Sequence, residues 1–160
     1  MSIKGGESLP EGTFTRMTEA GPAPVTTKEL FAGKKVVLFA VPGAFTPTCS
    51  KQHLPGYLAQ HDAIKAKGVD TIACMAVNDV FVMDEWARAN GVGDRIVMLA
   101  DGNGTYTKAL GLEFDLSGFG MGIRSRRFSM VVDDGVVKEL NVESGAGVSV
   151  SGAEATVCQL

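Results

Sequence analysis

The stretch Val36–Val41, which reads Val-Val-Leu-Phe-Ala-Val, decides the fold. This apolar run is too short for a helix, and it is bounded by Gly33 and by the pair Pro42-Gly43. A continuous apolar run of this length predicts a strand buried on both faces, which is typical of the central strand of an α/β sheet. Helical and strand-like segments alternate after it and end in a hairpin, so we expect an α/β domain with a mixed sheet.

Apolar residues recur at helical spacing from Cys49 to Lys67, so a helix is expected there, and Pro55 should kink or split it. The pair Asn78-Asp79 is expected to cap the next helix. Further helices are expected at Val82–Asn90, Thr105–Leu110 and Gly152–Leu160. Further strands are expected at Thr13–Met17, Val69–Val77 and Arg95–Ala100, and a hairpin at Arg127–Val132 and Val136–Leu140 around an Asp-Gly turn. We expect a turn at Gly21–Pro24 and a glycine-rich loop at Gly111–Gly122.

The length of 160 residues leaves room for one domain, and we expect residues 1–160 to form it. Lys and Arg total 15 against 18 Asp and Glu, and this net charge of −3 gives no field that would attract nucleic acid. No apolar run approaches the ~20 residues of a membrane span, and the first residues lack the apolar core of a secretory signal. We therefore expect a cytoplasmic protein that binds neither nucleic acid nor membranes.

The cysteines need individual explanations. Three of them, without a Cys-x-x-Cys pair, do not make a disulfide framework, and with only two histidines a structural zinc site is not expected. Cys49 is expected in the first turn of the helix after the central strand, where free N–H groups and the helix dipole stabilise a thiolate. An ordinary cysteine is only ~3% thiolate at pH 7, so this placement predicts a more reactive thiol. Thr46 precedes it by three residues, and its hydroxyl can reach the sulfur or a bound oxygen.

A lone cysteine is more often a small buried hydrophobe than a nucleophile. The Pro-x-x-x-Thr-x-x-Cys spacing at a strand-to-helix junction favours the nucleophile here. The stretch Pro42–Gly56, PGAFTPTCSKQHLPG, resembles the signature around the peroxidatic cysteine of peroxiredoxins, in particular of the type II or Prx5-like subfamily. Lys67–Trp86 resembles that subfamily's next strand and helix, and Arg124–Val132 resembles the strand with its catalytic arginine. The resemblance implies a thioredoxin-like fold, with a mixed central sheet flanked by helices.

The resemblance also implies a thiol peroxidase that reduces hydrogen peroxide and alkyl hydroperoxides through a sulfenic acid on Cys49. No metal or organic cofactor is then required. The implied site roles are the nucleophile for Cys49, the peroxide-orienting hydroxyl for Thr46, the shield of the thiolate for Pro42 and the active-site arginine for Arg127. The backbone N–H groups of Thr48 and Cys49 are expected to bind the substrate oxygen, where they would stabilise the charge that develops on it.

Two other arginines, Arg124 and Arg126, are alternatives to Arg127. Because side chains alternate along a strand, Arg126 and Arg127 point to opposite faces, and we expect Arg127 to approach Cys49. His53 follows Cys49 by one helical turn, where it could assist electrostatically or simply be packed or solvated.

A second thiol must resolve the sulfenic acid. Mammalian-type relatives carry a resolving cysteine in the loop that corresponds to Val142–Ser151, and this chain has none there. Cys74 resembles the second cysteine of plant and bacterial members, but it lies in an apolar strand, so it is either a resolver or an inert buried residue. Cys158 is expected to be a bystander. We therefore expect glutaredoxin and glutathione to be the reductant, with thioredoxin acting through a Cys49–Cys74 disulfide as the alternative.

The resemblance further implies a non-covalent homodimer. Phe45, Phe81 and Phe119 are candidates for its contact patch, although burial in the core is the default for an aromatic residue. Two rival functions stay open: a peroxide sensor or holdase that uses oxidation of Cys49 as a signal, and a thioredoxin-type dithiol oxidoreductase. The absence of a Cys-x-x-Cys pair weakens the second rival.

Overall fold

The expected central strand is β3, Lys35–Ala40, in the computed structural model, which describes residues 2–145 and 147–160. β3 pairs in parallel with β4, Thr71–Ala76, and antiparallel with β8, Phe128–Asp133. Every residue of β3 after Lys35 is buried, because the sheet is covered on both faces. The prediction of a mixed sheet with a fully buried centre is confirmed.

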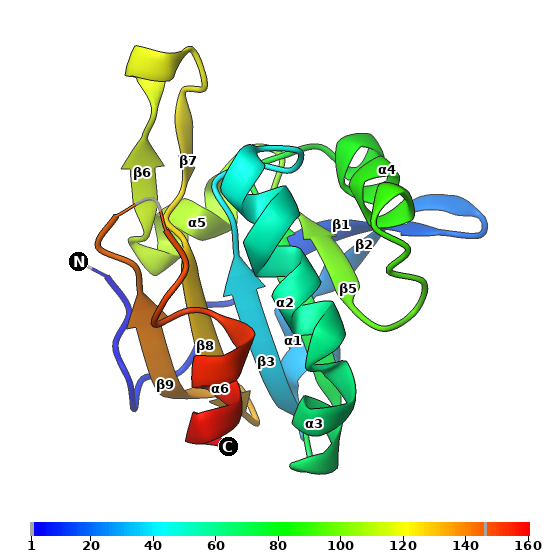
Figure 1. Ribbon diagram of the computed structural model, residues 1–160, viewed down its shortest axis with the longest axis vertical. Helices are drawn as coiled ribbons and strands as arrows, with labels where there is room; N and C mark the ends of the chain where they lie inside the picture. Colours follow the sequence, from blue (N-terminus) through cyan, green and yellow to red (C-terminus); the bar gives the residue numbers. More distant parts are fainter. Residues whose placement is uncertain (1, 146) are drawn as a thin grey trace.

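Four more strands complete the sheet, in the order β2-β1-β5-β4-β3-β8-β9. Their bounds are Thr13–Thr18 for β1, Gly21–Thr26 for β2, Val97–Ala100 for β5 and Val136–Val142 for β9. The three inner strands β3, β4 and β5 run parallel, and the outer strands are antiparallel (Figure 1). β3 ends at Ala40, and the segment that follows it leads to Cys49.

Side-chain alternation along β3 divides the core into two layers. Val37 and Phe39 join the cluster under α2 (Leu54–Ala59), α3 (His61–Ala66), α4 (Val80–Ala89) and α6 (Ala153–Gln159). Val36 and Leu38 join the opposite cluster, with α1 (Thr27–Phe31) and α5 (Thr105–Leu110). In Figure 1, α2, α3 and α6 lie in front of the sheet, so Cys49 and Cys74 both belong to the layer on that side.

The helix expected from Cys49 to Lys67 is three segments. Cys49–His53 forms a π-helical segment, η1, whose last bond runs from the Leu54 N–H to the Cys49 carbonyl. Pro55 follows as the second residue of α2, where its missing N–H is tolerated. The break between α2 and α3 falls at Gln60 instead, so the prediction that Pro55 splits the helix is wrong in position.

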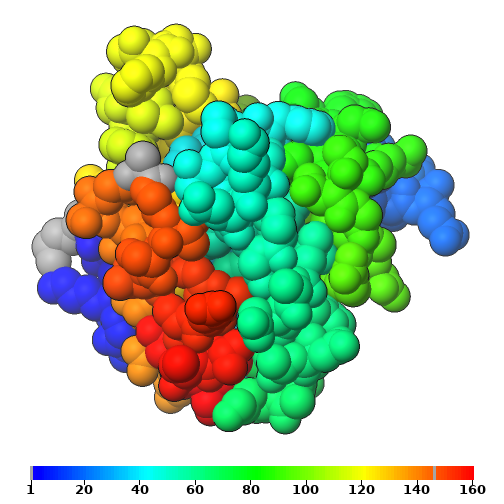
Figure 2. Space-filling model, in the orientation of Figure 1, coloured from blue at the N-terminus to red at the C-terminus, as the bar shows by residue number. Residues whose placement is uncertain are grey.

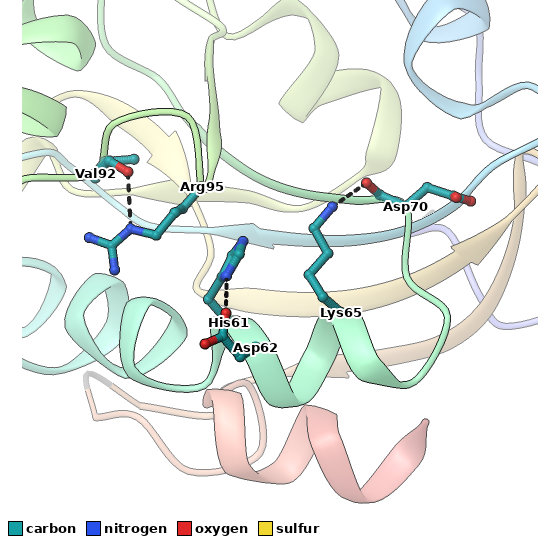
Figure 3. Close-up of polar contacts among 6 residues, drawn as sticks. All are labelled: His61, Asp62, Lys65, Asp70, Val92 and Arg95. Carbon is teal, nitrogen blue, oxygen red and sulfur yellow. Dashed lines mark hydrogen bonds and ion pairs between the residues drawn. The ribbon is translucent and has the colours of Figure 1, made fainter.

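Lys65 of α3 ties this helix to the start of β4. Its ammonium group donates to the Asp70 carbonyl, as Figure 3 shows, and the Asp70 carboxylate accepts from the Lys35 N–H at 2.8 Å. Figure 3 also shows His61 at the start of the same helix, with Nδ1 2.9 Å from Asp62 Oδ1. Asp70 thus connects the start of β3, through Lys35, with α3, through Lys65.

Two expectations for irregular structure are wrong. The expected turn at Gly21–Pro24 is part of β2, an edge strand, where Pro22 and Pro24 need no N–H for a further neighbour. The expected loop at Gly111–Gly122 contains β6 (Glu113–Asp115) and the 3-10 segment η2 (Ser117–Phe119), and β6 pairs with β7 (Ile123–Ser125). This small hairpin projects from the body, as Figures 1 and 2 show. No helix in the described part of the chain is long and apolar enough to span a membrane.

The Asp-Gly turn between β8 and β9 generates a stability prediction. Asp134 and Gly135 both have positive φ, 48° and 79°, as the expected hairpin turn requires. Replacing Gly135 by Ala puts a Cβ into the left-handed region and should lower the free energy of unfolding by about 1–2 kcal/mol. Gly118→Ala is the control, because Gly118 lacks a positive φ and an added Cβ meets nothing within 4 Å. Equal urea midpoints for the two variants would contradict the prediction.

Candidate active site

Cys49 lies fully buried at the start of the helical segment that follows β3. The helix opens at Pro47, and the Ser50 N–H donates to the Thr46 carbonyl at 2.9 Å, which closes the first turn. The amides of Thr48 and Cys49 precede that bond, so they are among the free N–H groups of a helix start. Both can therefore donate to an oxygen that approaches the sulfur.

Arg127, immediately before β8, is the arginine that reaches the sulfur. Its Nη2 donates to Cys49 Sγ at 3.0 Å, and its Nη1 donates to His53 Nδ1 at 2.9 Å. The side chain is buried, and its Nε is the buried side-chain nitrogen that lacks a hydrogen-bond partner among the described residues. One N–H of the guanidinium is thus buried without a partner among the described residues.

The two alternative arginines make other contacts. Arg126 lies over the Phe114 ring, with 5.7 Å between the guanidinium carbon and the ring centroid. Nη1 of Arg124 donates to the Val77 carbonyl at 3.2 Å and to the Pro42 carbonyl at 3.5 Å. Arg124 therefore braces the loop before Cys49, a role that the strand pattern did not predict.

Thr46 and Pro42 border a cavity of about 290 Å³ together with Thr48 and Arg127. The rest of its lining combines apolar side chains, among them Phe114, Leu116, Phe119 and Met121, with the polar residues Arg126, Glu143 and Ser144. The Thr46 hydroxyl donates to the Gly43 carbonyl at 2.7 Å, so only its lone pairs are left for a substrate. This narrows the expected function of that hydroxyl, which was to donate as well as to accept.

The loop before the cysteine is held under backbone strain. Phe45 has a φ of 63°, which is uncommon for a residue other than glycine, and the residue is 54% exposed. The Ala44 N–H donates to Asn78 Oδ1 at 2.9 Å, which fixes the loop next to this residue. Of the expected capping pair, Asp79 caps α4 through the Val82 N–H, whereas Asn78 serves this loop.

His53 is fully buried and sits between Arg127 and the Ser151 carbonyl. A carbonyl only accepts and a guanidinium only donates, so the ring is neutral, with its proton on Nε2 and a lone pair on Nδ1. Burial, helped by the Arg127 charge, lowers the pKa of His53 to about 4 against the opposing effect of the Ser151 bond. The sequence left open whether His53 assists electrostatically or is simply packed or solvated. In the structure it is packed in the core, and it also accepts a hydrogen bond from Arg127.

Sequence reasoning missed the residues that support His53 from the far end of the chain. The Ser151 carbonyl accepts from the Tyr57 hydroxyl at 2.8 Å as well as from His53 Nε2 at 3.0 Å. Glu143 in turn accepts from the Ser151 N–H and hydroxyl. The sequence carries no signal for the contacts of Ser151 with His53 and Tyr57, because they join residues 98 and 94 positions apart.

The other two cysteines have contrasting surroundings. Cys74 is buried in the middle of β4, paired with Phe39 on one side and Met98 on the other. Burial, with a smaller contribution from Cys49, raises the pKa of the Cys74 thiol well above its usual range. Cys158 is exposed on α6. Within residues 2–145 and 147–160, no group of three or more His, Cys, Asp and Glu side chains is arranged to hold a metal ion.

Comparisons with known proteins agree with this geometry. The sequence profile of the Redoxin family matches residues 4–157. Peroxiredoxin-2E, chloroplastic, of Arabidopsis thaliana is 47% identical over 157 residues, covering 96% of this chain and 67% of the relative. Peroxiredoxin-2E-2, chloroplastic, of Oryza sativa subsp. japonica is 51% identical over 158 residues, with 96% and 70% covered. The crystal structure of reduced Prx3 from Vibrio vulnificus in complex with hydrogen peroxide superposes with a TM-score of 0.94 at 54% identity, covering 98% of both chains.

The expected cytoplasmic location is contradicted by these relatives, since both plant proteins are named as chloroplastic. Composition and net charge do not determine the compartment of a protein, because targeting depends on separate signals and not on the packing of a folded domain.

The profile match extends over nearly the whole chain, and the relatives are similar along the same length. The buried thiol, the arginine on its sulfur and the adjoining cavity lie within the matched residues. This chain therefore belongs to the peroxiredoxin family, in its type II branch, and is a thiol peroxidase with a thioredoxin-like fold.

Proposed function

We propose that this peroxidase reduces hydrogen peroxide and alkyl hydroperoxides at Cys49. The contact that carries the proposal is the 3.0 Å bond from Arg127 Nη2 to Cys49 Sγ, because it places a buried cationic donor directly on the sulfur that would attack the peroxide. The apolar lining of the adjoining cavity suits an alkyl chain on the substrate.

The proposed step is a displacement on oxygen. The thiolate attacks the hydroxyl oxygen of ROOH, so that an S–O bond forms as the O–O bond breaks and Cys49 becomes a sulfenic acid. The leaving RO⁻ takes up a proton from water to become an alcohol, or water when R is hydrogen. The buried Nε–H of Arg127, which has no partner among the described residues, and the amides of Thr48 and Cys49 are the proposed donors to the developing charge, and such bonds strengthen in the transition state. The Thr46 lone pairs accept from the hydroperoxide O–H, and Pro42 shields the sulfur.

Glutathione and glutaredoxin are the proposed reductant. Cys49–SOH and one glutathione thiol form a mixed disulfide and water, and a second thiol then releases Cys49 and oxidised glutathione. Cys74 is buried and held in β4 by its pairing with β3, which supports an external thiol as the resolver. A disulfide requires close Cα atoms and suitably directed Cβ atoms, and a residue held in a strand cannot adjust its backbone to meet that requirement. Thioredoxin acting through a Cys49–Cys74 disulfide is the alternative, which the shared core layer of the two thiols favours.

A cysteine series tests the catalytic assignment. Cys49→Ser should abolish hydroperoxide consumption, since a hydroxyl does not supply the thiolate nucleophile. Cys158→Ser should retain wild-type turnover with glutaredoxin and glutathione, and it serves as the matched control. Steady-state consumption of hydrogen peroxide and of cumene hydroperoxide measures both. Turnover that persists in Cys49→Ser would remove Cys49 as the nucleophile.

Cys74→Ser distinguishes the two reductants in the same assay. With glutaredoxin and glutathione as the proposed route, this variant should keep wild-type activity. A loss of turnover in Cys74→Ser, with thioredoxin as the effective reductant of the wild type, would establish the alternative.

Acid should weaken the fold through His53, whose neutral ring the Arg127 contact requires. The unfolded histidine binds a proton below pH 6.5 and the folded one only near pH 4. The unfolded state therefore binds more protons in this window, and stability falls as the pH is lowered through it. We expect a loss of about 2–3 kcal/mol between pH 7 and 4.5 from this group. Urea unfolding at several pH values measures the loss.

His53→Gln should flatten that pH dependence, because a glutamine side chain does not titrate. The control is His61→Gln, since the His61 ring contacts Asp62 at the surface and neither Arg127 nor Ser151. A slope that survives unchanged in His53→Gln would disprove the assignment.

A non-covalent homodimer is also proposed for this chain. Phe45, Phe81 and Phe119 are 54%, 65% and 81% exposed, so the default of core burial does not apply to them. Exposed aromatic rings of this kind are common at protein interfaces. Sedimentation velocity should give a dimer for the wild type and a monomer for Phe119→Glu. A wild type that sediments as a monomer would refute the proposal.

A further inference from the structure

Glu143 lies directly after β9, and its carboxylate accepts hydrogen bonds from two serines further along the chain. Its Oε2 accepts from the Ser149 N–H at 2.7 Å, the Ser151 N–H at 2.8 Å and the Ser151 hydroxyl at 2.6 Å, and its Oε1 accepts from the Ser149 hydroxyl at 2.8 Å. The residue is only 7% exposed. Four donors on one buried carboxylate make a rigid junction, because hydrogen bonds to a charged acceptor are stronger than those between neutral groups.

This junction fixes the carbonyl that orients His53. The Ser151 N–H and hydroxyl are bound to Glu143, while the Ser151 carbonyl accepts from His53 Nε2 at 3.0 Å. That bond keeps the proton on Nε2, so Nδ1 presents a lone pair to Arg127 Nη1 at 2.9 Å. The same guanidinium donates to Cys49 Sγ at 3.0 Å.

Glu143 also holds the main chain of Arg127. Its own N–H donates to the Arg127 carbonyl at 2.9 Å. The backbone of the arginine and the partner of its side chain are thus tied to a single residue. A shift of that residue would move both ends of Arg127 relative to the sulfur.

The carboxylate is suited to this task because it stays charged. Burial alone would raise the pKa of Glu143, but the hydrogen bonds from Ser151 and Ser149 outweigh it and lower the pKa to about 2. An amide in its place would turn an NH₂ group toward one of these donors and leave that donor unpaired in a buried position.

We propose that Glu143 is a positioning residue of the peroxidase: by clamping Ser151 it sets the tautomer of His53 and, through His53, the place of the Arg127 guanidinium at Cys49. The inference rests on the role proposed above for Arg127. It predicts that the effect of Glu143 on Cys49 requires Arg127.

A double-mutant cycle tests this dependence. The rate constant for oxidation of Cys49 by hydrogen peroxide is measured by stopped-flow fluorescence in the wild type, Glu143→Gln, Arg127→Ala and the double variant. Trp86 is the reporter, since it is the single tryptophan and donates to Ser50, the neighbour of Cys49, at 3.0 Å. Glu143→Gln should slow the reaction about tenfold when Arg127 is present and less than about twofold when it is absent.

Asp101→Asn is the matched control. Asp101 is likewise buried and accepts from the Tyr106 N–H, the Thr107 N–H and the Thr107 hydroxyl, yet it contacts none of the residues around Cys49. Its replacement should lower the melting temperature and leave the oxidation rate within about twofold of the wild type.

The tautomer supplies a spectroscopic readout. In ¹⁵N-histidine NMR spectra, His53 of the wild type should give one protonated Nε2 and one unprotonated Nδ1, and Glu143→Gln should lose this preference while His61 is unchanged. If Glu143→Gln does not fold, Ser151→Ala takes its place in the cycle, because it removes one donor and keeps the backbone bond. It should give a smaller loss that again requires Arg127.

Equal slowing by Glu143→Gln in both backgrounds would overturn the inference, since it would indicate a general structural effect. An unchanged rate in a folded Glu143→Gln variant would also overturn it. A different result would contradict the role proposed for Arg127 itself. In that case Cys49 of the Arg127→Ala variant would be oxidised as fast as Cys49 of the wild type, and the inference about Glu143 would fail as well.

Discussion

The contact between the Arg127 guanidinium and Cys49 Sγ is the constraint that organises this molecule. A buried guanidinium is costly to desolvate, and a hydrogen bond to a neutral acceptor lowers that cost without neutralising its charge. A carboxylate directly on Arg127 would draw the guanidinium away from the thiol. The fold instead supplies a neutral histidine acceptor, and the carboxylate of Glu143 lies two hydrogen bonds beyond that histidine, on the other side of Ser151. The arginine remains cationic and directed at the sulfur.

The packing around this contact explains why the histidine stays neutral. His53 lies against the Phe39 ring, with 4.9 Å between ring centroids, and Phe39 stacks on Tyr57 at 4.0 Å. These rings belong to the apolar layer under α2, so the imidazole is removed from water. The buried strand that defines the sheet therefore also lowers the pKa of a residue that supports the site.

Local sequence was sufficient for the elements whose signals are local. The apolar run of β3, the Asp-Gly turn and the thiol at a helix start each depend on neighbouring residues, and they occur where the pattern indicated. The β6–β7 hairpin was missed because its short strands lack apolar alternation and are largely exposed. The His53 contacts were out of reach for a different reason, since they join residues 74 and 98 positions apart.

The order of these residues along the chain has a consequence for synthesis. Cys49 leaves the ribosome well before Arg127, and Ser151 follows later still. Domains form as the chain emerges, but β3 has no antiparallel partner and the thiol has no guanidinium until β8 is made. A nascent chain that ends before Arg127 thus carries Cys49 without the guanidinium that donates to its sulfur in the folded protein. The contact between the guanidinium and the thiol forms only after most of the sheet around it has been translated.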